Sequence, residues 1–395
     1  MERLEKRVFG TLFFAIFVTV TGVGIVVPLL PVYAHNVGAS GVAIGMLFGS
    51  FSLSRALFPP FFGRWSDRRG RKPLIVIGLL AYALIAGLFL SFSSVAGLIL
   101  IRFFQGIASA ALMPVIQAYV GDIAPRGREG ATLGCFNMAM FLGLGFGPFL
   151  GGAIQDAWGL AAAFAAMGLL ALLGGLLAQA LLPPAGAERT LSAPQPPVFW
   201  RRLLLDREIV GLFIFRFGYT FGIGSIWGFL PVLAAAEHAL SSAAIGSILM
   251  LGVLLSGITQ LPMGMAADRF DKRRLIGLGG AVVGFSLAAI GWAGGYAGLA
   301  AVLAAFGVGG GICTAAHMAL AVQKGGRMNC MGAVMAILTV AHSTGMMAGA
   351  LIAGLAMDLL SLGAVFPLGA AVMLACTLMF LFGGGRRPEA APGAN

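Results

Sequence analysis

The sequence predicts an all-α membrane protein with twelve transmembrane helices in two pseudo-symmetric six-helix bundles. Hydrophobic residues make up 59% of the 395 residues, charged residues only 10%, and the mean hydropathy is +0.97. Apolar runs of about 20 residues recur along the chain, which is the length needed to cross a bilayer. These runs lack the alternation of barrel strands, so helices are expected. This composition excludes an ordinary soluble protein.

Polar breaks between the apolar runs define the twelve spans. Their expected bounds are 8–33, 41–62, 73–93, 95–118, 131–155, 160–182, 208–233, 243–265, 274–294, 297–320, 330–356 and 362–384. The longest polar gap, 183–207, is rich in Pro and Ala and lies midway. We therefore predict an N-terminal bundle over 1–188, a linker over 189–207 and a C-terminal bundle over 208–395.

Basic residues fall in alternate loops. They occupy the N-terminus, the segment 63–72, Arg126 and Arg128, the linker, 269–274, Lys324 and Arg327, and Arg386 and Arg387. The opposite loops contain no Lys or Arg, so the positive-inside rule places both termini and the linker in the cytoplasm. Short loops and tails favour a bacterial inner membrane. The net charge of +11 does not indicate nucleic-acid binding, because the basic residues form no soluble basic surface.

The two halves of the sequence resemble each other at an offset near 200. Four matched pairs lie around the second and eighth spans, and one pair follows the fifth and eleventh: Gly45 with Gly246, Gly63 with Gly264, Asp67 with Asp268, Lys72 with Arg273, and Asp156 with Asp358. Parallel six-helix repeats are typical of secondary transporters, whose substrate site lies between the repeats.

Three motifs resemble the major facilitator superfamily. The loop "GRWSDRRGRK" matches G-x-x-x-D-R-x-G-R-K/R through Gly63, Asp67, Arg68, Gly70, Arg71 and Lys72, with a degenerate copy at Gly264 and Asp268. The fourth span matches R-x-x-Q-G through Arg102, Gln105 and Gly106. The fifth span matches G-x-x-x-G-P-x-x-G-G through Gly143, Gly147, Pro148, Gly151 and Gly152, and this motif resembles the antiporter branch, which includes drug–proton exporters.

The resemblance implies rocker-switch alternating access with a conformational latch in the basic loop. Asp67 would cap the cytoplasmic N-terminus of the eleventh span, where it would also face the positive end of the helix dipole. Arg71 would pair with Asp122. Alternatively, the loop only anchors orientation.

The glycines of the fifth span allow close helix packing, and we expect that span to seal against its pseudo-symmetric partner over 330–356. Plain helix packing is the alternative.

Candidate substrate and coupling residues lie inside the spans. Arg102, Gln105 and Gly106 belong to the fourth span and Arg216 to the seventh, although Arg102 could instead bond backbone carbonyls. His342 is the best candidate proton carrier, followed by His317, with a helix–helix hydrogen bond as the alternative for each. No acid lies well inside a span, which favours a neutral or anionic amphiphile over a cation.

A copper importer is the alternative transporter class. On the eleventh span Met331 lies four residues before Met335, and His342 four before Met346; on the tenth, Cys313 lies four before His317. Soft sulfur with imidazole suits Cu(I). Methionine also fills gaps between apolar helices. A non-transporting receptor is a third possibility, against which the intact motifs argue. The chain carries no phosphate-binding loop, so ATP-driven pumping is not expected.

The sequence thus predicts a monomeric secondary transporter rather than an enzyme, with no cofactor besides the proton gradient. Its partners would be a small molecule, protons and the bilayer, without nucleic acid. Spans 1, 4, 7 and 10, with 5 and 11, should line the path. Five aromatic residues are expected to contribute to a permissive cavity: Phe103, Phe104, Phe215, Phe221 and Trp227.

Overall fold

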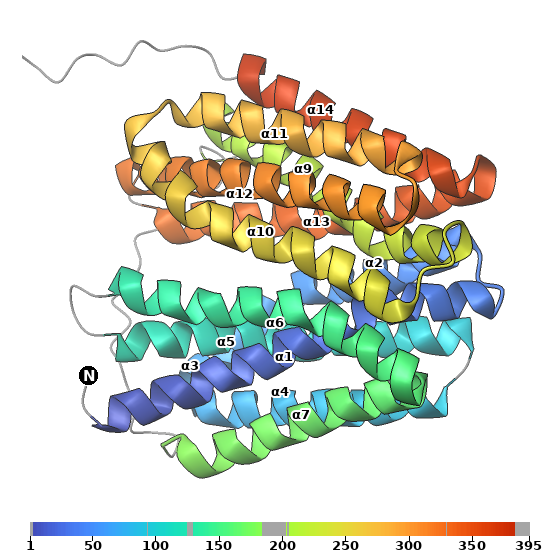
Figure 1. Ribbon diagram of the computed structural model, residues 1–395. Helices are drawn as coiled ribbons and strands as arrows, with labels where there is room; N and C mark the ends of the chain where they lie inside the picture. The colour runs from blue at the N-terminus through green and yellow to red at the C-terminus, as the bar shows by residue number, and fades with distance from the viewer. Residues whose placement is uncertain are drawn as a thin grey trace, which may run out of the picture.

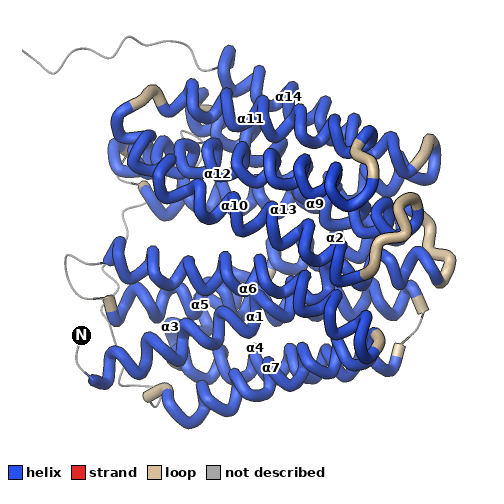
Figure 2. Tube along the Cα trace, viewed as in Figure 1, coloured by secondary structure: helices blue, strands red, loops and turns tan. Residues whose placement is uncertain are grey.

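The computed structural model describes residues 3–92, 94–124, 129–183, 203, 205–328 and 330–383, and this part is helical throughout (Figures 1 and 2). The first half contains α1 (Arg3–Asn36), α2 (Gly41–Leu57), α3 (Pro59–Arg69), α4 (Arg71–Ser91), α5 (Val95–Ile123), α6 (Glu129–Trp158) and α7 (Leu160–Leu181). The second half contains α9 (Arg207–Ala236), α10 (Ser242–Arg269), α11 (Lys272–Ala289), η1 (Ile290–Trp292), α12 (Gly295–Arg327), α13 (Met331–Leu359), η2 (Leu362–Ala364) and α14 (Val365–Gly383).

The described helices match the predicted number of spans. Eleven are long and apolar enough to cross a membrane, or twelve when α2 and α3 count as one bent span. The prediction of one helix over 41–62 is wrong in detail, because α2 ends at Leu57 and the pair bends by 41°. Pro59 lacks the backbone N–H that would continue the helix, and it occupies the start of α3 instead.

The two halves repeat the same packing pattern. In the first half α1 packs on α6 and α7, α2 on α5, and α4 on α5 and α7. In the second half α9 packs on α13 and α14, α10 on α12, and α11 on α12 and α14. Each contact of the first half therefore has its counterpart in the second, as the sequence repeat predicts. Figure 1 shows the halves as two layers of helices.

Two crosswise contacts join the halves. Helix α6 packs on α10, the counterpart of α2, and α2 packs on α13, the counterpart of α6. The contacts concentrate at the far face, defined here as the end of the molecule where α1 ends and α2 begins. The opposite end, where α1 begins and α14 ends, is called the terminal face.

Small residues make these crossings close. A Cβ atom at Gly152 of α6 would collide with the backbone of Ser242 at the start of α10. Likewise, Gly354 of α13 lies against the backbone of Gly41 at the start of α2. Helix backbones in a membrane approach this closely only where side chains are small. The far face is therefore closed by direct backbone packing.

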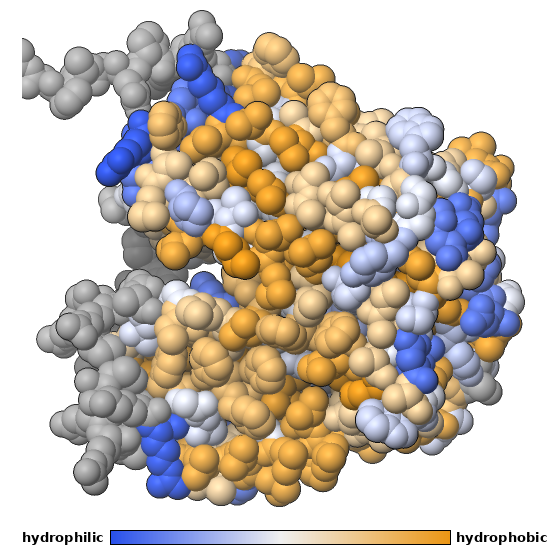
Figure 3. All heavy atoms as spheres, in the orientation of Figure 1, coloured by the Kyte–Doolittle hydropathy of each residue, from blue (hydrophilic) through white to orange (hydrophobic). Residues whose placement is uncertain are grey.

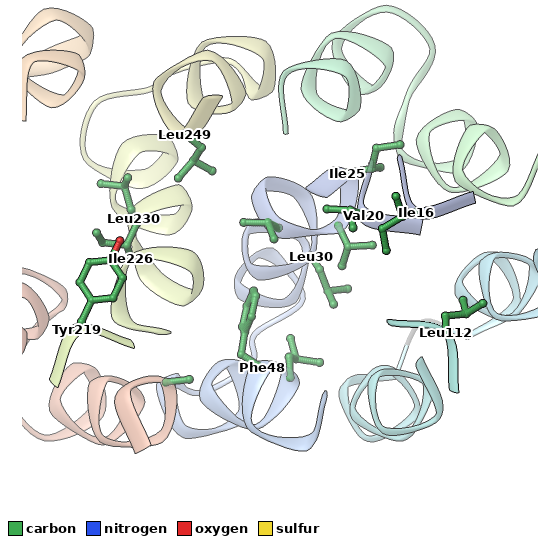
Figure 4. Close-up of a cluster of buried hydrophobic side chains, with 14 of the residues drawn as sticks. Ile16, Val20, Ile25, Leu30, Phe48, Leu112, Tyr219, Ile226, Leu230 and Leu249 are labelled. Atoms are coloured by element: carbon green, nitrogen blue, oxygen red, sulfur yellow. The ribbon is translucent and has the colours of Figure 1, made fainter. Parts of the chain in front are cut away.

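Buried apolar side chains connect the halves near the middle of the molecule. Figure 4 shows side chains of α1 (Ile16, Val20, Ile25, Leu30), α2 (Phe48), α9 (Tyr219, Ile226, Leu230) and α10 (Leu249) gathered between the helices. Phe48 and Leu30 are 1% and 0% exposed, respectively, so this region is packed as a core. On the face shown in Figure 3, apolar side chains cover most of the outer surface.

Candidate functional site

A cavity of about 1090 Å³ lies between the halves. Its walls come from α1, α2, α5 and α6 on one side and from α9, α10, α12, α13 and the first residue of α11 on the other. It extends from Arg216 and His342 in the interior to Asp268 and Lys272 at the terminal face. Figure 3 shows the molecule hollowed between the halves at the edge where α1 begins. The structure is therefore open at the terminal face and closed at the far face.

The walls include all six helices predicted to line the path, and also α2, α10 and the first residue of α11. Sequence reasoning missed α2 and α10, although α10 carries a visible signal. Small or polar residues recur every four positions along one side of this helix and face the cavity: Gly252, Ser256, Gln260, Gly264 and Asp268. A spacing of four places side chains on one helix face. A shorter stripe of the same kind lies on α12, at Ala315, Ala319 and Gln323.

The charges of the cavity are mostly positive. In the described part of the chain its lining contains three cationic side chains, those of Arg55, Arg216 and Lys272, and one carboxylate, that of Asp268. Arg55 comes from α2 in the first half and Arg216 from α9 in the second. Arg55 was not selected as a site residue from the sequence, although it is charged and lies within a span.

Arg216 is held in place from two sides. Its Nη2 lies 3.2 Å from Nδ1 of His342 on α13, and its guanidinium carbon lies 6.0 Å from the ring centre of Tyr219. Arginine can only donate, so Nδ1 of His342 accepts this hydrogen bond and carries no proton. The contact fixes the imidazole as the neutral Nε2–H tautomer. Protonation at Nδ1 would break the contact and place two cations side by side.

Arg102 lies outside the cavity lining. It is 1% exposed, and its Nε donates to the carbonyl of Leu47 at 3.0 Å. Its Nη1 donates to Oε1 of Gln105 at 2.8 Å, and its guanidinium stacks over Phe51 at 4.4 Å. The backbone-bonding alternative therefore describes its geometry in this state. Gly106, the third residue of the motif, lets α5 approach the backbone of Phe51.

Other predicted cavity residues lie within the helix packing. His317 is 1% exposed and its Nε2 lies 3.0 Å from the carbonyl oxygen of Leu212, so it joins α12 to α9. Phe215 and Phe221 are buried, and Phe104 is largely exposed on the outer surface. Of the five aromatic residues expected in the cavity, the lining includes Trp227 alone.

The basic loop forms an ion pair within the first half. Nε of Arg71 lies 2.6 Å from Oδ2 of Asp122, as the sequence predicted. Gly70 ends α3 with φ at +87°, a conformation that favours glycine. The predicted cap of α13 by Asp67 stays a prediction, because the side chain of Asp67 is not among the described ones. The exposed Arg68 and the unobstructed Gly63 and Gly264 lie at the terminal face.

A corresponding ion pair lies in the second half. Nζ of Lys324 on α12 lies 2.9 Å from both Asp206 and Glu208 at the start of α9. Burial alone would raise the pKa of Asp206, but hydrogen bonds from Lys324 and from the backbone of Ile209 and Glu208 lower it. Neither this pair nor that of Arg71 joins the two halves. Each pair therefore links helices within its own half at the terminal face.

The glycine motif of α6 packs on α1. Gly143, Gly147 and Gly151 lie against the backbones of Phe17, Thr21 and Ile25, respectively. The prediction that this helix seals against residues 330–356 is therefore wrong for this state. The main neighbours of α6 are α1 and α10, because the halves meet crosswise. Gly152 and the carbonyl of Pro148 serve the contact with α10.

Two aspartates cap helices of the opposite half at the far face. The carboxylate of Asp156, at the end of α6, accepts hydrogen bonds from the N–H groups of Ser242 and Ala243 at 3.1 and 2.8 Å. The carboxylate of Asp358, at the end of α13, accepts from Gly41 and Val42 at 2.5 and 2.8 Å. The first N–H groups of a helix have no partner within it. These matched residues of the repeat thus make equivalent bonds.

The sulfur and imidazole groups of α13 are spread along the helix. Met331 is at its terminal-face end, whereas His342 and Met346 line the cavity. At 1.5 Å per residue, Met331 and Met346 are ~22 Å apart along the axis and cannot share one ion. Among the described residues no group of three His, Cys, Asp or Glu side chains could hold a metal. No contact favours the copper alternative.

A multi-pass helical protein with repeated halves and a cavity open at one face is built as a membrane transporter. The sequence model of the Major Facilitator Superfamily matches residues 12–220 and 212–395. The chain belongs to this superfamily, and it is a transporter of that class.

Similar proteins cover most of the chain. An uncharacterized MFS-type transporter of Methanocaldococcus jannaschii is 29% identical over 374 residues, which are 94% of this chain and 96% of the relative. Multidrug resistance protein 1 of Bacillus subtilis is 27% identical over 259 residues, 65% of each chain. The crystal structure of the nucleoside transporter NupG superposes with a TM-score of 0.80 at 12% identity, covering 96% of this chain and all of that chain. This last likeness shows the fold.

Proposed function

We propose that the protein exports a small amphiphilic compound, neutral or anionic, in exchange for protons by rocker-switch alternating access. The observation that carries this proposal is the central cavity, which is open at the terminal face and closed at the far face by two equivalent crossings. The terminal face would lie in the cytoplasm of a bacterial inner membrane, and the basic loops at this face support that orientation. A cavity open to the cytoplasm can load cargo for export.

The lining supports an amphiphilic cargo. Most of it is apolar, with Met113, Met140, Phe141 and Trp227 among the larger side chains. Methionine and aromatic side chains adapt to apolar ligands of varied shape. Among the described residues, the single carboxylate of the lining, that of Asp268, lies at the terminal-face end rather than deep in the cavity. A permanent cation would therefore find no counter-charge next to Arg216.

His342 is the candidate proton carrier. It lies in the cavity wall, and its acceptor Nδ1 is engaged by Arg216 in the observed state. A proton that enters at Nδ1 displaces the guanidinium, so protonation and the position of Arg216 are linked. His317 is less suited to this role, because it lies within the packing between α9 and α12.

Transport by purified protein in proteoliposomes tests the proposal. An imposed pH gradient should drive movement of an amphiphile such as radiolabelled 2-naphthalenemethanol or 2-naphthalenesulfonate against the direction of proton flow. A protonophore should abolish that movement. His342→Ala should uncouple movement from the gradient, whereas His238→Ala, at the far face, should not. Movement of both probes that ignores the gradient would refute proton exchange.

A further inference from the structure

The central cavity contains an imbalance of charge that its proposed function does not by itself require. Arg55 and Arg216 both line the interior part of the cavity, and each belongs to a different half. No ion pair of either residue occurs in the described part of the chain, whose ion pairs lie at the terminal face.

Uncompensated charges inside a membrane are costly and usually face a partner or a water-filled cavity. Arg102 is an example of a buried arginine whose donors and faces have partners. Its guanidinium bonds a backbone carbonyl and the Gln105 amide and lies against two aromatic rings. Arg55 has no such set of bonds, and Arg216 has one hydrogen bond, from Nη2 to His342. Donors of both groups therefore remain available to the cavity.

We propose that Arg55 and Arg216 form a two-sided site for a single anionic head group, so that the cargo is an amphiphilic organic anion. This inference rests on the proposed function and narrows its substrate class. Guanidinium groups bind carboxylate, sulfonate and phosphate oxygens through paired N–H donors. The apolar body of such an anion would lie against Met113, Phe141 and Trp227 in the same cavity.

His342 acts as a positioning residue for this site. Its bond to Nη2 and the ring of Tyr219 orient the Arg216 guanidinium and leave its remaining donors toward the cavity. An anion placed between the two arginines contacts both halves at once. Binding of such an anion would therefore depend on the relative position of the two halves, which is not true of a site within one half.

Binding to the full chain in lipid nanodiscs tests this site without any transport step. The probes are 2-naphthalenesulfonate, 2-naphthalenemethanol and 2-naphthyltrimethylammonium, which share one ring system and differ in charge, and empty nanodiscs correct for partition into lipid. We expect the sulfonate to bind at least about 10-fold more tightly than the other two, as charge-assisted hydrogen bonds predict. Equal binding of the three probes, or preference for the cation, would overturn the proposal.

Variants identify the residues. Arg216→Gln and Arg55→Gln should each weaken sulfonate binding about 10- to 100-fold and change binding of the neutral probe little. Arg216→Lys and Arg55→Lys keep the charge and should retain the preference for the anion, which separates charge from folding. Arg7→Gln, on the exposed part of α1 at the terminal face, is the matched control. Equal losses for the neutral probe and the sulfonate would assign both arginines a structural role and refute the site.

Failure of this inference differs from failure of the proposed function. If the neutral probe moves with the pH gradient while the sulfonate does not bind, export stands and the anion site is wrong. If the sulfonate binds through both arginines while neither probe is driven by the gradient, the anion site stands and proton exchange is wrong.

Discussion

At the scale of single residues, two arginines within spans have opposite surroundings. Arg102 is 1% exposed and is surrounded by bonds from its own half, whereas Arg216 faces the cavity with one side-chain partner. A buried guanidinium without an acid is stable only when its donors meet acceptors and its faces meet aromatic rings. The two residues therefore differ in where their side chains point: that of Arg102 points into the helix packing, and that of Arg216 points into the cavity.

Arg102→Gln should destabilise the protein without changing its choice of cargo. The substitution removes the donor to the Leu47 carbonyl and leaves Oε1 of Gln105 without its charged partner, which should cost about 2–4 kcal/mol. The measurement is the unfolding midpoint Tm in detergent, with Arg216→Gln as the comparison. A loss of sulfonate binding by Arg102→Gln at unchanged Tm would contradict the structural role.

The sequence could identify these arginines but could not orient them. Position in a span follows from hydropathy, whereas the side of a helix that faces a cavity depends on which neighbours pack against it. Arg55 is an example, because the sequence places its charge within a span, whereas its position in the cavity wall is seen only in the structure. Spacing gave partial guidance, because the stripe from Gly252 to Asp268 marks a helix face without saying what that face meets.

At the scale of elements, the far face is held by helix ends. Asp156 and Asp358 each cap the N-terminus of a helix in the other half, so these bonds exist only while the far face is closed. The carboxylates also face the positive end of the helix dipole. The sequence repeat identified the two aspartates as equivalent. It could not identify the helices that they cap, because the crosswise packing of the halves is not encoded by any local pattern.

Removing both caps should favour opening of the far face. An N-cap contributes about 1 kcal/mol, so Asp156→Ala with Asp358→Ala should shift the equilibrium about 10- to 30-fold toward the far-face-open state. Spin labels at Val37 and Glu237, exposed in opposite halves at the far face, would report a longer distance in a Cys135→Ser background.

The matched control is another capping aspartate. Asp271 caps α11 within the second half, through the N–H groups of Arg273 and Arg274. Asp271→Ala should therefore lower helix stability by a similar amount and leave the distance between the labels unchanged. The same lengthening in both variants would mean that capping stabilises the fold in general and does not close the far face.

At the scale of the whole molecule, the sequence repeat makes the two crossings between the halves, α6 on α10 and α2 on α13, equivalent. The sequence predicted the fold class, the number of spans and the pairing of repeated residues, because hydropathy and charge depend on local composition. It placed α6 against α13, whereas the structure places α6 against α10 and α2 against α13. In the proposed alternating-access cycle, the helices that meet between the halves would differ from one state to another, whereas the same sequence must fit every state.

Two glycines on α10 should therefore have opposite effects on that cycle. Gly246 lies at the far-face crossing, where a Cβ atom would collide with the carbonyl of Pro148, so Gly246→Val should prevent far-face closure and lengthen the spin-label distance.

Gly264, near the terminal face, has open space around it in this state. If the terminal face closes by the matched approach of Gly63 and Gly264, Gly264→Val should hold the terminal face open and keep the labels close. Both variants should abolish transport while retaining the fold, since each blocks one half of the exchange. A shift in the same direction for both would contradict a rocking motion about the central cavity.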